Sequence, residues 1–228
     1  LPMSHISVLL FETVESLLAD RTTGVYIDAT FGRGGHTRLL LSKLDENARV
    51  YAFDKDPQAL EVAVALAQED PRFTIIHASF ADIKEKMQEI GVMSVDGIMA
   101  DLGVSSPQLD QAERGFSFMQ DGPLDMRMDN SKGLTAAEWL LEIEEEQLAN
   151  IIYQYGEERY SRRIAKAIKQ AGKLDTTAQL AELVKTAHPK WEKHKHPATR
   201  TFQAIRIAIN KELDDIEVFL PQAVDLLK

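Results

Sequence analysis

The most informative segment of the sequence is Asp28-Ala29-Thr30-Phe31-Gly32-Arg33-Gly34-Gly35-His36. It overlaps the end of a short apolar run, Val25–Ala29, which has the length and composition of a buried strand. A helical pattern follows, with Leu39, Leu40 and Leu44 on one face. A glycine-rich turn between a strand and a helix lets the backbone approach a ligand closely and presents free N–H groups to it.

Strand and helix signals alternate through the first hundred residues. Three more short apolar segments predict strands, at Arg49–Phe53, Phe73–His77 and Val95–Ala100. Helices are predicted near Gly35, from Asp56-Pro57 (with Asp as N-cap and Pro at the first helical position) and over Ala81–Ile90. This alternation predicts an α/β fold with a parallel sheet built from βαβ units.

The pattern changes after Asp101. Residues 103–133 are rich in Gly, Pro, Ser and Asp and predict irregular structure, whereas the chain from Thr135 to about Leu227 is almost wholly helical in pattern. Thr135 and Glu138 have the spacing of a capping box. We therefore expect residues 1–108 to form the first part of an α/β core, 109–203 to form an inserted helical domain, and 204–228 to return to the core.

The composition excludes several classes of protein. The 228 residues include no cysteine, which excludes disulfides and thiolate metal sites. His194 and His196 stand among lysines rather than carboxylates, so we expect no metal. No apolar stretch approaches the roughly 20 residues that cross a bilayer. We expect a cytoplasmic protein without a membrane partner.

The charge is distributed unevenly along the chain. The net charge is −10, which argues against a general nucleic-acid binder. Residues 159–211, however, contain 13 Lys and Arg against three acidic residues and carry +10, while the remainder carries −20. This asymmetry indicates either one face for a polyanion or a solvated basic helix surface.

Carboxylates near the glycine turn suggest which cofactor it binds. Asp54 lies 22 residues beyond Gly32, at the end of the next predicted strand, where a carboxylate can accept both ribose hydroxyls of an adenosine. Thr37 replaces the third glycine of the dinucleotide fingerprint, which argues against a nicotinamide-dependent oxidoreductase. Asp28, directly before the turn, suits the cationic amino-acid end of S-adenosylmethionine, contacted directly or through water.

Two further strand ends are expected at the same edge of the sheet. Phe80 follows the third strand and either stacks on an adenine or packs in the core. Asp101 follows the fourth strand and either faces cofactor and substrate or serves as a turn residue.

Four segments together resemble one family along essentially the whole chain: Asp28–His36 (DATFGRGGH), Asp101–Asp110 (DLGVSSPQLD), Glu113–Arg127 (ERGFSFMQDGPLDMR) and His196–Arg206 (HPATRTFQAIR). The chain is similar to the bacterial ribosomal RNA small-subunit methyltransferase H family, also called MraW. The resemblance implies a class I, Rossmann-like methyltransferase core with an inserted helical domain. It also implies methylation of N4 of a cytidine in the decoding region of 16S ribosomal RNA, with the RNA or the small ribosomal subunit as partner. The cofactor contacts that it implies are Gly34, Gly35, His36, Asp54, Phe80, Asp101 and Gln108, to which turn chemistry adds Asp28 and Gly32.

The chain departs from the family pattern at two places. Ser7 stands where the family usually has proline. The family also continues with a Pro-Gly-Gly turn and a strand with an Ile-Ser-Phe-His-Ser-like motif, which this chain lacks. We therefore expect a sheet without its last strands and with an exposed edge.

Cytosine N4 is a poor nucleophile because its lone pair is delocalised into the ring. Asp101 and the turn Leu102–Pro107 are predicted to accept hydrogen bonds from N4 and so orient it. Ser106 is a second catalytic candidate, because Ser106-Pro107 is loosely similar to the Ser-Pro-Pro-Tyr motif of amino-methylating DNA enzymes, although the tyrosine is absent. A DNA amino-methyltransferase and a non-catalytic RNA-binding assembly factor remain alternatives, and both a monomer and a homodimer remain open.

Aromatic and basic residues of the insertion are the candidates for contact with RNA. Phe116 or Phe118 either stacks on a flipped base or anchors the insertion. For Trp139 and Trp191, a place in the core is expected over base stacking. The predicted RNA contacts are Phe116, Phe118, Arg159, Arg162, Arg163, Lys166, His196 and Arg200.

Overall fold

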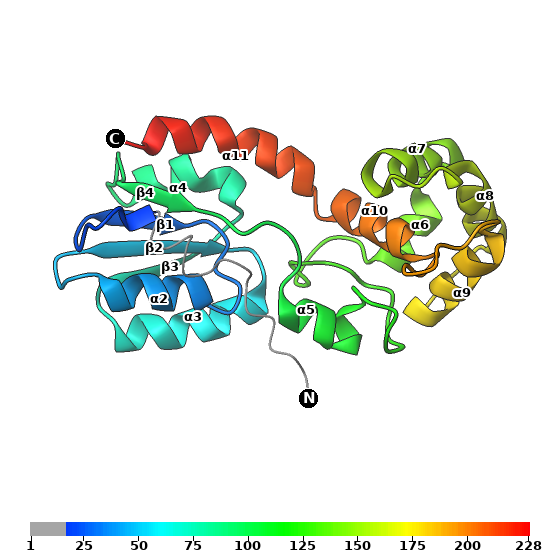
Figure 1. Ribbon diagram of the computed structural model, residues 1–228, viewed down its shortest axis with the longest axis horizontal. Helices are drawn as coiled ribbons and strands as arrows, with labels where there is room; N and C mark the ends of the chain where they lie inside the picture. The colour runs from blue at the N-terminus through cyan, green and yellow to red at the C-terminus, as the bar shows by residue number, and fades with distance from the viewer. Residues whose placement is uncertain (1–16) are drawn as a thin grey trace. The chain divides into compact units, whose positions relative to one another are not determined.

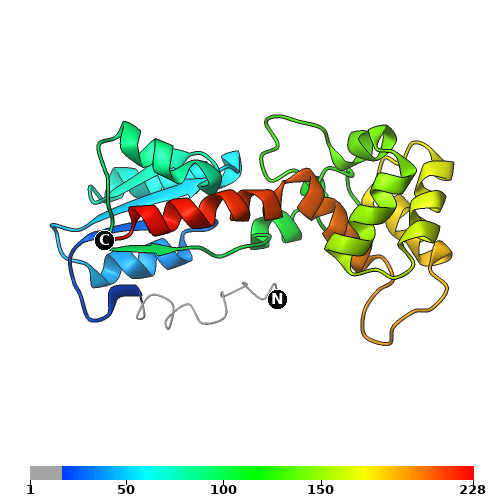
Figure 2. The same ribbon diagram turned by 90° about the horizontal axis from the view of Figure 1, so that it is seen from above.

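The computed structural model describes residues 17–228 and divides into two compact units (Figures 1 and 2). Unit 1 contains the chain up to Ser105 together with Leu213–Lys228, and unit 2 contains Ser106–Glu212. The predicted return to the core at residue 204 falls inside helix α10 (Thr199–Ile209), and the structure places the return at Leu213. Ser7 lies outside the described residues.

Unit 1 is built on a parallel sheet of four strands in the order β3-β2-β1-β4. The strands are β1 (Val25–Asp28), β2 (Arg49–Asp54), β3 (Phe73–His77) and β4 (Gly97–Met99). All four predicted strands are present, and β4 is shorter than predicted. The parallel pairing confirms the α/β fold.

Helices cover both faces of the sheet, as Figure 1 shows. Helices α2 (Gly35–Lys43) and α3 (Pro57–Glu69) bury Leu40, Leu41 and Leu66 against one face. A 3₁₀ turn, η1 (Phe80–Asp82), leads into α4 (Ile83–Glu89), which covers the other face together with α11 (Glu212–Leu226). Helix α3 begins where predicted, because the Asp56 carboxylate accepts a hydrogen bond from the Gln58 N–H.

The C-terminal residues meet the β4 side of the sheet. The Val95 N–H donates to the Leu226 carbonyl at 2.8 Å, and the Lys228 N–H donates to the Val95 carbonyl at 3.1 Å. This parallel bridge lies just before β4. Within residues 17–228, β4 is an edge strand, and no other strand pairs with its outer side.

Unit 2 is helical. Its helices are α5 (Ser106–Asp110), α6 (Ala136–Glu142), α7 (Glu145–Gly156), α8 (Ser161–Ala171), α9 (Thr177–Ala187) and α10. The segment predicted to be irregular contains α5 and a 3₁₀ turn, η2 (Ala112–Arg114), so that prediction was partly wrong. The capping box of Thr135 and Glu138 is confirmed, and Thr176 with Gln179 forms a second one.

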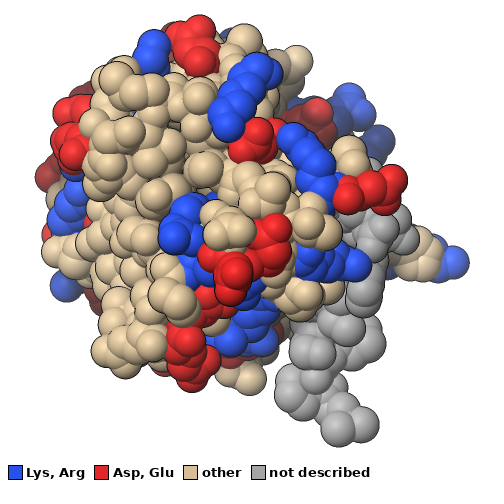
Figure 3. Space-filling model, turned by 90° about the vertical axis from the view of Figure 1, so that its left-hand side faces the viewer, with Lys and Arg blue, Asp and Glu red and all other residues tan. Residues whose placement is uncertain are grey.

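Helix α8 separates apolar and basic side chains, as its sequence predicted. Ile164 and Ile168 are buried, while Arg162, Arg163 and Lys166 are exposed. By contrast, the face drawn in Figure 3 shows Lys and Arg interleaved with Asp and Glu, so it presents no single sign of charge to a polyanion. Across residues 17–228, no helix is both long and apolar enough to cross a membrane.

Candidate cofactor site and basic surface

The strand order places a switch point at the carboxyl end of β1. The chain runs outward from β1 through β2 to β3 and then returns to the opposite side of β1 as β4. In an open parallel sheet, ligands bind beyond the carboxyl ends of the strands at such a point. Asp28 ends β1, Asp54 ends β2 and Asp101 follows β4 by two residues. The sheet therefore gathers all three predicted carboxylates at one edge of unit 1.

Asp54 fixes the glycine turn. Its Oδ2 accepts a hydrogen bond from the Gly32 N–H at 2.9 Å, and its Oδ1 accepts one from the Asp56 N–H at 2.9 Å. Burial raises the pKa of Asp54, and these two N–H groups oppose that shift. Each carboxylate oxygen keeps a second lone pair in this arrangement, which suits it to a ligand hydroxyl.

The glycines of the turn serve different purposes. Gly34 has φ 86°, and a Cβ there would lie 2.6 Å from Cζ of Phe31, so no other residue fits without displacement. A Cβ at Gly32 or Gly35 would meet no atom within 4 Å. The space in front of these two glycines is open, as close approach of a ligand to the backbone requires.

Asp28 is 1% exposed and holds the start of α2. Its Oδ1 accepts from the Thr30 N–H at 3.1 Å, and its Oδ2 accepts from the Thr37 hydroxyl at 2.6 Å. Thr37, the residue that breaks the dinucleotide fingerprint, thus has a definite hydrogen-bonding role that the sequence did not reveal. Burial raises the pKa of Asp28 to about 7, and the nearby charges of Asp54 and Asp101 add to the shift.

The raised pKa of Asp28 gives a testable pH dependence. The folded protein binds the Asp28 proton more tightly than the unfolded chain, whose Asp pKa is near 3.8. The stabilising contribution is therefore fully present below the unfolded pKa and is lost as the pH rises through about 7. We expect the free energy of unfolding to fall between about pH 4 and pH 7, by at most on the order of 4 kcal/mol, and to change little above pH 7 on account of this group.

Denaturant titrations at several pH values measure this fall, and Asp28→Asn is the matched control. Its amide oxygen can still accept from the Thr30 N–H, and its amide nitrogen can donate to the Thr37 hydroxyl. We expect the variant to have a flatter profile over this range. An identical pH profile in the variant and the parent would show that Asp28 does not titrate there.

Asp101 is linked to the end of β1 through its backbone. Its N–H donates to the Thr30 hydroxyl oxygen at 2.6 Å, while its side chain is exposed. Thr30 therefore joins the carboxyl ends of β1 and β4, a contact that spans 71 residues and that no local pattern indicates.

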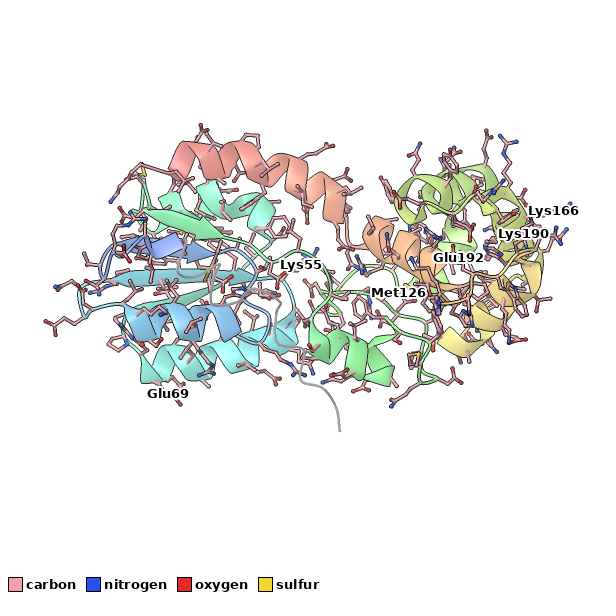
Figure 4. The ribbon with its side chains drawn as sticks, viewed as in Figure 1. Lys55, Glu69, Met126, Lys166, Lys190 and Glu192 are labelled. Carbon is pink, nitrogen blue, oxygen red and sulfur yellow. The ribbon has the colours of Figure 1, made fainter. Side chains whose placement is uncertain are left out.

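Phe80 lies at the start of η1 and is half-buried. Its ring packs edge-on against Phe219 of α11, with the ring centroids 5.2 Å apart. The carboxylate of Asp215, also in α11, accepts a hydrogen bond from the hydroxyl of the neighbouring Ser79 at 3.2 Å. It also forms an ion pair with Lys55 (labelled in Figure 4), with 3.5 Å between Lys55 Nζ and Asp215 Oδ2. Part of the Phe80 ring therefore packs in the core, as one of the two alternatives predicted. Stacking of the ring on an adenine remains a prediction.

The other predicted cofactor and catalytic residues are placed as follows. His36 is half-buried in the first turn of α2. Ser106 begins α5 and is half-buried, and Gln108 is a buried residue of the same helix. The latter two belong to unit 2, so their roles at the cofactor site remain predictions from the family resemblance.

The long Glu113–Arg127 motif forms an internal framework of unit 2. Arg114 is buried and donates to the carbonyls of Arg127 and Met128 at 3.0 and 2.9 Å. Phe116 is 6% exposed, and the Arg114 guanidinium lies 5.8 Å from its ring centroid. The burial of Phe116 supports the anchor alternative over base stacking, because a buried ring offers no face to a base.

Phe118 is half-buried and also engaged within unit 2. Its ring lies 4.7 Å from that of Phe202 and 4.5 Å from that of His196, centroid to centroid. His196 Nδ1 accepts a hydrogen bond from the Ala198 N–H, and burial lowers the pKa of His196. The lowered pKa favours the neutral form of His196, which makes it a weaker candidate for a phosphate contact than the arginines and lysines.

The basic candidates divide into engaged and exposed residues. Arg200 forms an ion pair with Glu192 at 2.7 Å. The Arg159 guanidinium lies 5.3 Å from the Tyr160 ring centroid. Arg162, Arg163 and Lys166 are exposed on α8 and form no ion pair within residues 17–228. These three are the strongest of the predicted phosphate contacts.

The two tryptophans differ in exposure. Trp139 of α6 is half-buried, in partial agreement with its predicted place in the core. Trp191 is 59% exposed, so its predicted place in the core is wrong. The lysines around it are a sequence signal of this exposure, because an apolar core does not accommodate so many charges.

The sheet, the glycine turn at its switch point and the carboxylates beside it define a Rossmann-like α/β protein with a candidate site for a nucleoside cofactor. Comparisons with known proteins identify the family. A family model described as the MraW methylase family matches residues 2–228, and the chain belongs to that family.

Three curated relatives share the name Ribosomal RNA small subunit methyltransferase H. The protein of Acinetobacter baumannii strain ATCC 17978 is 97% identical over 99% of this chain, which spans 74% of that relative. The Acinetobacter baylyi protein is 82% identical over 99% of the chain and 75% of its own length. The Psychrobacter protein is 56% identical over 98% of the chain and 68% of its own length.

A solved structure described as a putative rRNA methylase from Clostridium thermocellum is only weakly similar. It aligns with 49% of this chain and 59% of its own chain, at 23% sequence identity and a TM-score of 0.36.

Proposed function

We propose that this protein is a cytoplasmic, S-adenosylmethionine-dependent ribosomal RNA methyltransferase, acting on N4 of a cytidine in the decoding region of 16S ribosomal RNA. The relatives named as small-subunit RNA methyltransferases support the RNA class of substrate. The cytidine N4 position rests on the family resemblance. The observation that carries the cofactor assignment is the glycine turn that Asp54 holds at the switch point of the sheet.

The residues at this turn fit S-adenosylmethionine. Open space in front of Gly32 and Gly35 admits a ligand to the backbone, and Asp54 is suited to accept from ribose hydroxyls. Asp28 is too buried for direct contact without movement, so we assign it an indirect role: its carboxyl group orients Thr30 and Thr37 beneath the turn. Bound there, the cofactor supplies an electrophilic methyl group.

Asp101 is the residue that we assign to orientation of the nucleophile. Its exposed carboxylate follows β4 at the same edge of the sheet, and its backbone is held by Thr30. A carboxylate that accepts hydrogen bonds from a cytosine amino group turns the nitrogen lone pair toward a methyl donor and lowers the barrier by orientation. Removal of the amine proton completes the reaction, and a carboxylate is a competent acceptor.

Calorimetric titration of S-adenosylmethionine into the chain, with NADH as the control ligand, tests the cofactor assignment. Saturable binding of S-adenosylmethionine alone is expected, because the turn lacks the third glycine of the dinucleotide fingerprint. Saturable binding of NADH instead would overturn the assignment. Mass spectrometry of nucleosides from 16S ribosomal RNA, after incubation with the enzyme and cofactor, tests the N4 position.

Charge reversal on α8 tests the RNA-facing surface. We expect Arg162→Glu combined with Arg163→Glu to weaken RNA binding at least tenfold and to reduce the slope of log affinity against log salt by roughly 0.7 to 0.9 per lost phosphate contact. Cofactor affinity should not change, because these side chains point away from the buried side of their own helix. Filter binding at several salt concentrations measures both quantities.

Lys86→Glu on α4 of unit 1 is the matched control for one of these reversals. Lys86 pairs with Glu89 of the same helix and is not a predicted RNA contact. Its reversal should leave RNA affinity within about twofold, as expected for a surface charge that makes no contact with the RNA and that salt screens. A loss of RNA affinity in the α4 variant half as large, on a logarithmic scale, as in the double α8 variant would show that only the net charge of the chain matters.

A further inference from the structure

Trp191 is an exposed aromatic ring held in a fixed position. Its Nε1–H lies 3.1 Å from the Lys185 carbonyl oxygen and 3.2 Å from the His188 carbonyl oxygen, at the C-terminal end of α9. These hydrogen bonds secure one edge of the indole, yet the residue remains 59% exposed. A ring that is ordered before binding loses little conformational entropy when a ligand packs on it.

Positive charges surround this ring. Lys185 Nζ lies 5.2 Å from its centroid, and Lys190, Lys193 and Lys195 are exposed nearby in sequence, without an ion pair in the described part of the chain. Glu192 is the one acidic residue among positions 188–197, and it is paired with Arg200. The loop thus presents excess positive charge beside an apolar ring.

The loop lies next to the basic end of α8. His188 Nε2 is 2.7 Å from Glu158 Oε1, and the His188 ring lies 5.0 Å from the Tyr160 ring, centroid to centroid. These contacts join the residues just before α8 to the first residue of the loop. Figure 4 shows Lys166 of α8 and Lys190 of the loop at the same end of unit 2. The loop that carries Trp191 therefore begins beside the N-terminal end of α8.

We propose that Trp191, with Lys190, Lys193 and Lys195, forms a docking platform for an unpaired nucleotide of the RNA substrate. The inference rests on the proposed RNA methyltransferase function and adds a second point of RNA contact, on the insertion. A base stacks on the indole while phosphates lie against the lysines, the combination that single-stranded nucleic acids require. Because the indole N–H is already engaged, the ring offers its face rather than a donor, which favours a base over an acidic peptide.

Tryptophan fluorescence gives a direct test. In a Trp139→Phe background, Trp191 is the one remaining tryptophan. Unstructured oligouridylate of roughly 12 nucleotides, within the usual site size, should quench its emission saturably. An RNA duplex of similar length should quench it less, because paired bases cannot stack on the ring. An oligoglutamate peptide should not quench the emission, since the platform attracts it only through charge.

The affinity of variants completes the test in the full chain. Trp191→Ala should weaken oligouridylate binding by roughly 5- to 150-fold, the range found for loss of one stacked base. Trp191→Phe loses the hydrogen bonds to α9 but keeps an aromatic face, so most of the affinity should remain. A uniform loss in both variants would mean that Trp191 acts only as a cap of α9, and the inference would fail.

The remaining outcomes separate this inference from the proposed function. Binding of oligouridylate without quenching, and with unchanged affinity in Trp191→Ala, would overturn the platform alone. Absence of binding to single-stranded and duplex RNA at low salt would overturn the platform together with the RNA partner. Equal binding of oligoglutamate and oligouridylate would show a purely electrostatic surface and would also overturn the platform.

Discussion

Asp101→Ala should reduce turnover at least about a hundredfold while leaving the fold intact. A positioned acid–base group typically contributes about 10²- to 10⁴-fold to a rate, and Asp101 is assigned both orientation and acceptance of hydrogen bonds from the amine. Its side chain is exposed, so its removal should leave the melting temperature nearly unchanged. Single-turnover methylation of 16S ribosomal RNA measures the effect.

Two controls define this experiment. The assay should use the protein extended to the length of its Acinetobacter baumannii relatives, because the chain spans 74% of them. Glu85→Ala removes an exposed carboxylate from α4 of the same unit and should leave turnover unchanged. Turnover of Asp101→Ala close to that of the parent would refute the assigned role. Cofactor affinity, measured in parallel, separates a loss of chemistry from a loss of binding.

Alanine substitutions at Gly34 and Gly35 should produce opposite effects on stability and binding. Gly34→Ala combines a left-handed backbone at φ 86° with a Cβ 2.6 Å from the Phe31 ring, so we expect a loss of roughly 1–3 kcal/mol in the free energy of unfolding. Gly35→Ala places its methyl group in open space at the first position of α2. Folding should be unaffected or slightly favoured, whereas S-adenosylmethionine affinity should fall at least about tenfold, because the methyl group occupies the space of the ligand.

Gly91→Ala is the control for backbone strain without a steric clash, since Gly91 has φ 80° and an added Cβ would meet no atom within 4 Å. It should be less destabilising than Gly34→Ala and should leave cofactor affinity unchanged. Chemical denaturation and calorimetry on the three variants measure these differences. Unchanged cofactor affinity in Gly35→Ala would show that the turn does not contact the cofactor.

Helix starts and strands were predicted well from the sequence, because the interactions that produce them lie within a few residues of one another. The Asp56-Pro57 helix start and the Thr135/Glu138 capping box each involve groups within three residues. The apolar strands were also recognisable, since a strand covered on both faces requires a continuous apolar run. Aromatic residues were harder to assign: Phe116 is buried and Trp191 exposed, because burial depends on which distant helices pack over a ring.

The α/β class, the glycine turn and the uneven distribution of charge along the chain could all be read from the sequence, as could the resemblance to the family. Tertiary structure alone decided the strand order, which brings Asp28, Asp54 and Asp101 to one edge of the sheet. It also decided the Thr30 contact with Asp101 and the burial of Phe116. The physical reason is that hydrophobic period and capping act over a few residues, whereas pairing and burial join residues far apart in the chain.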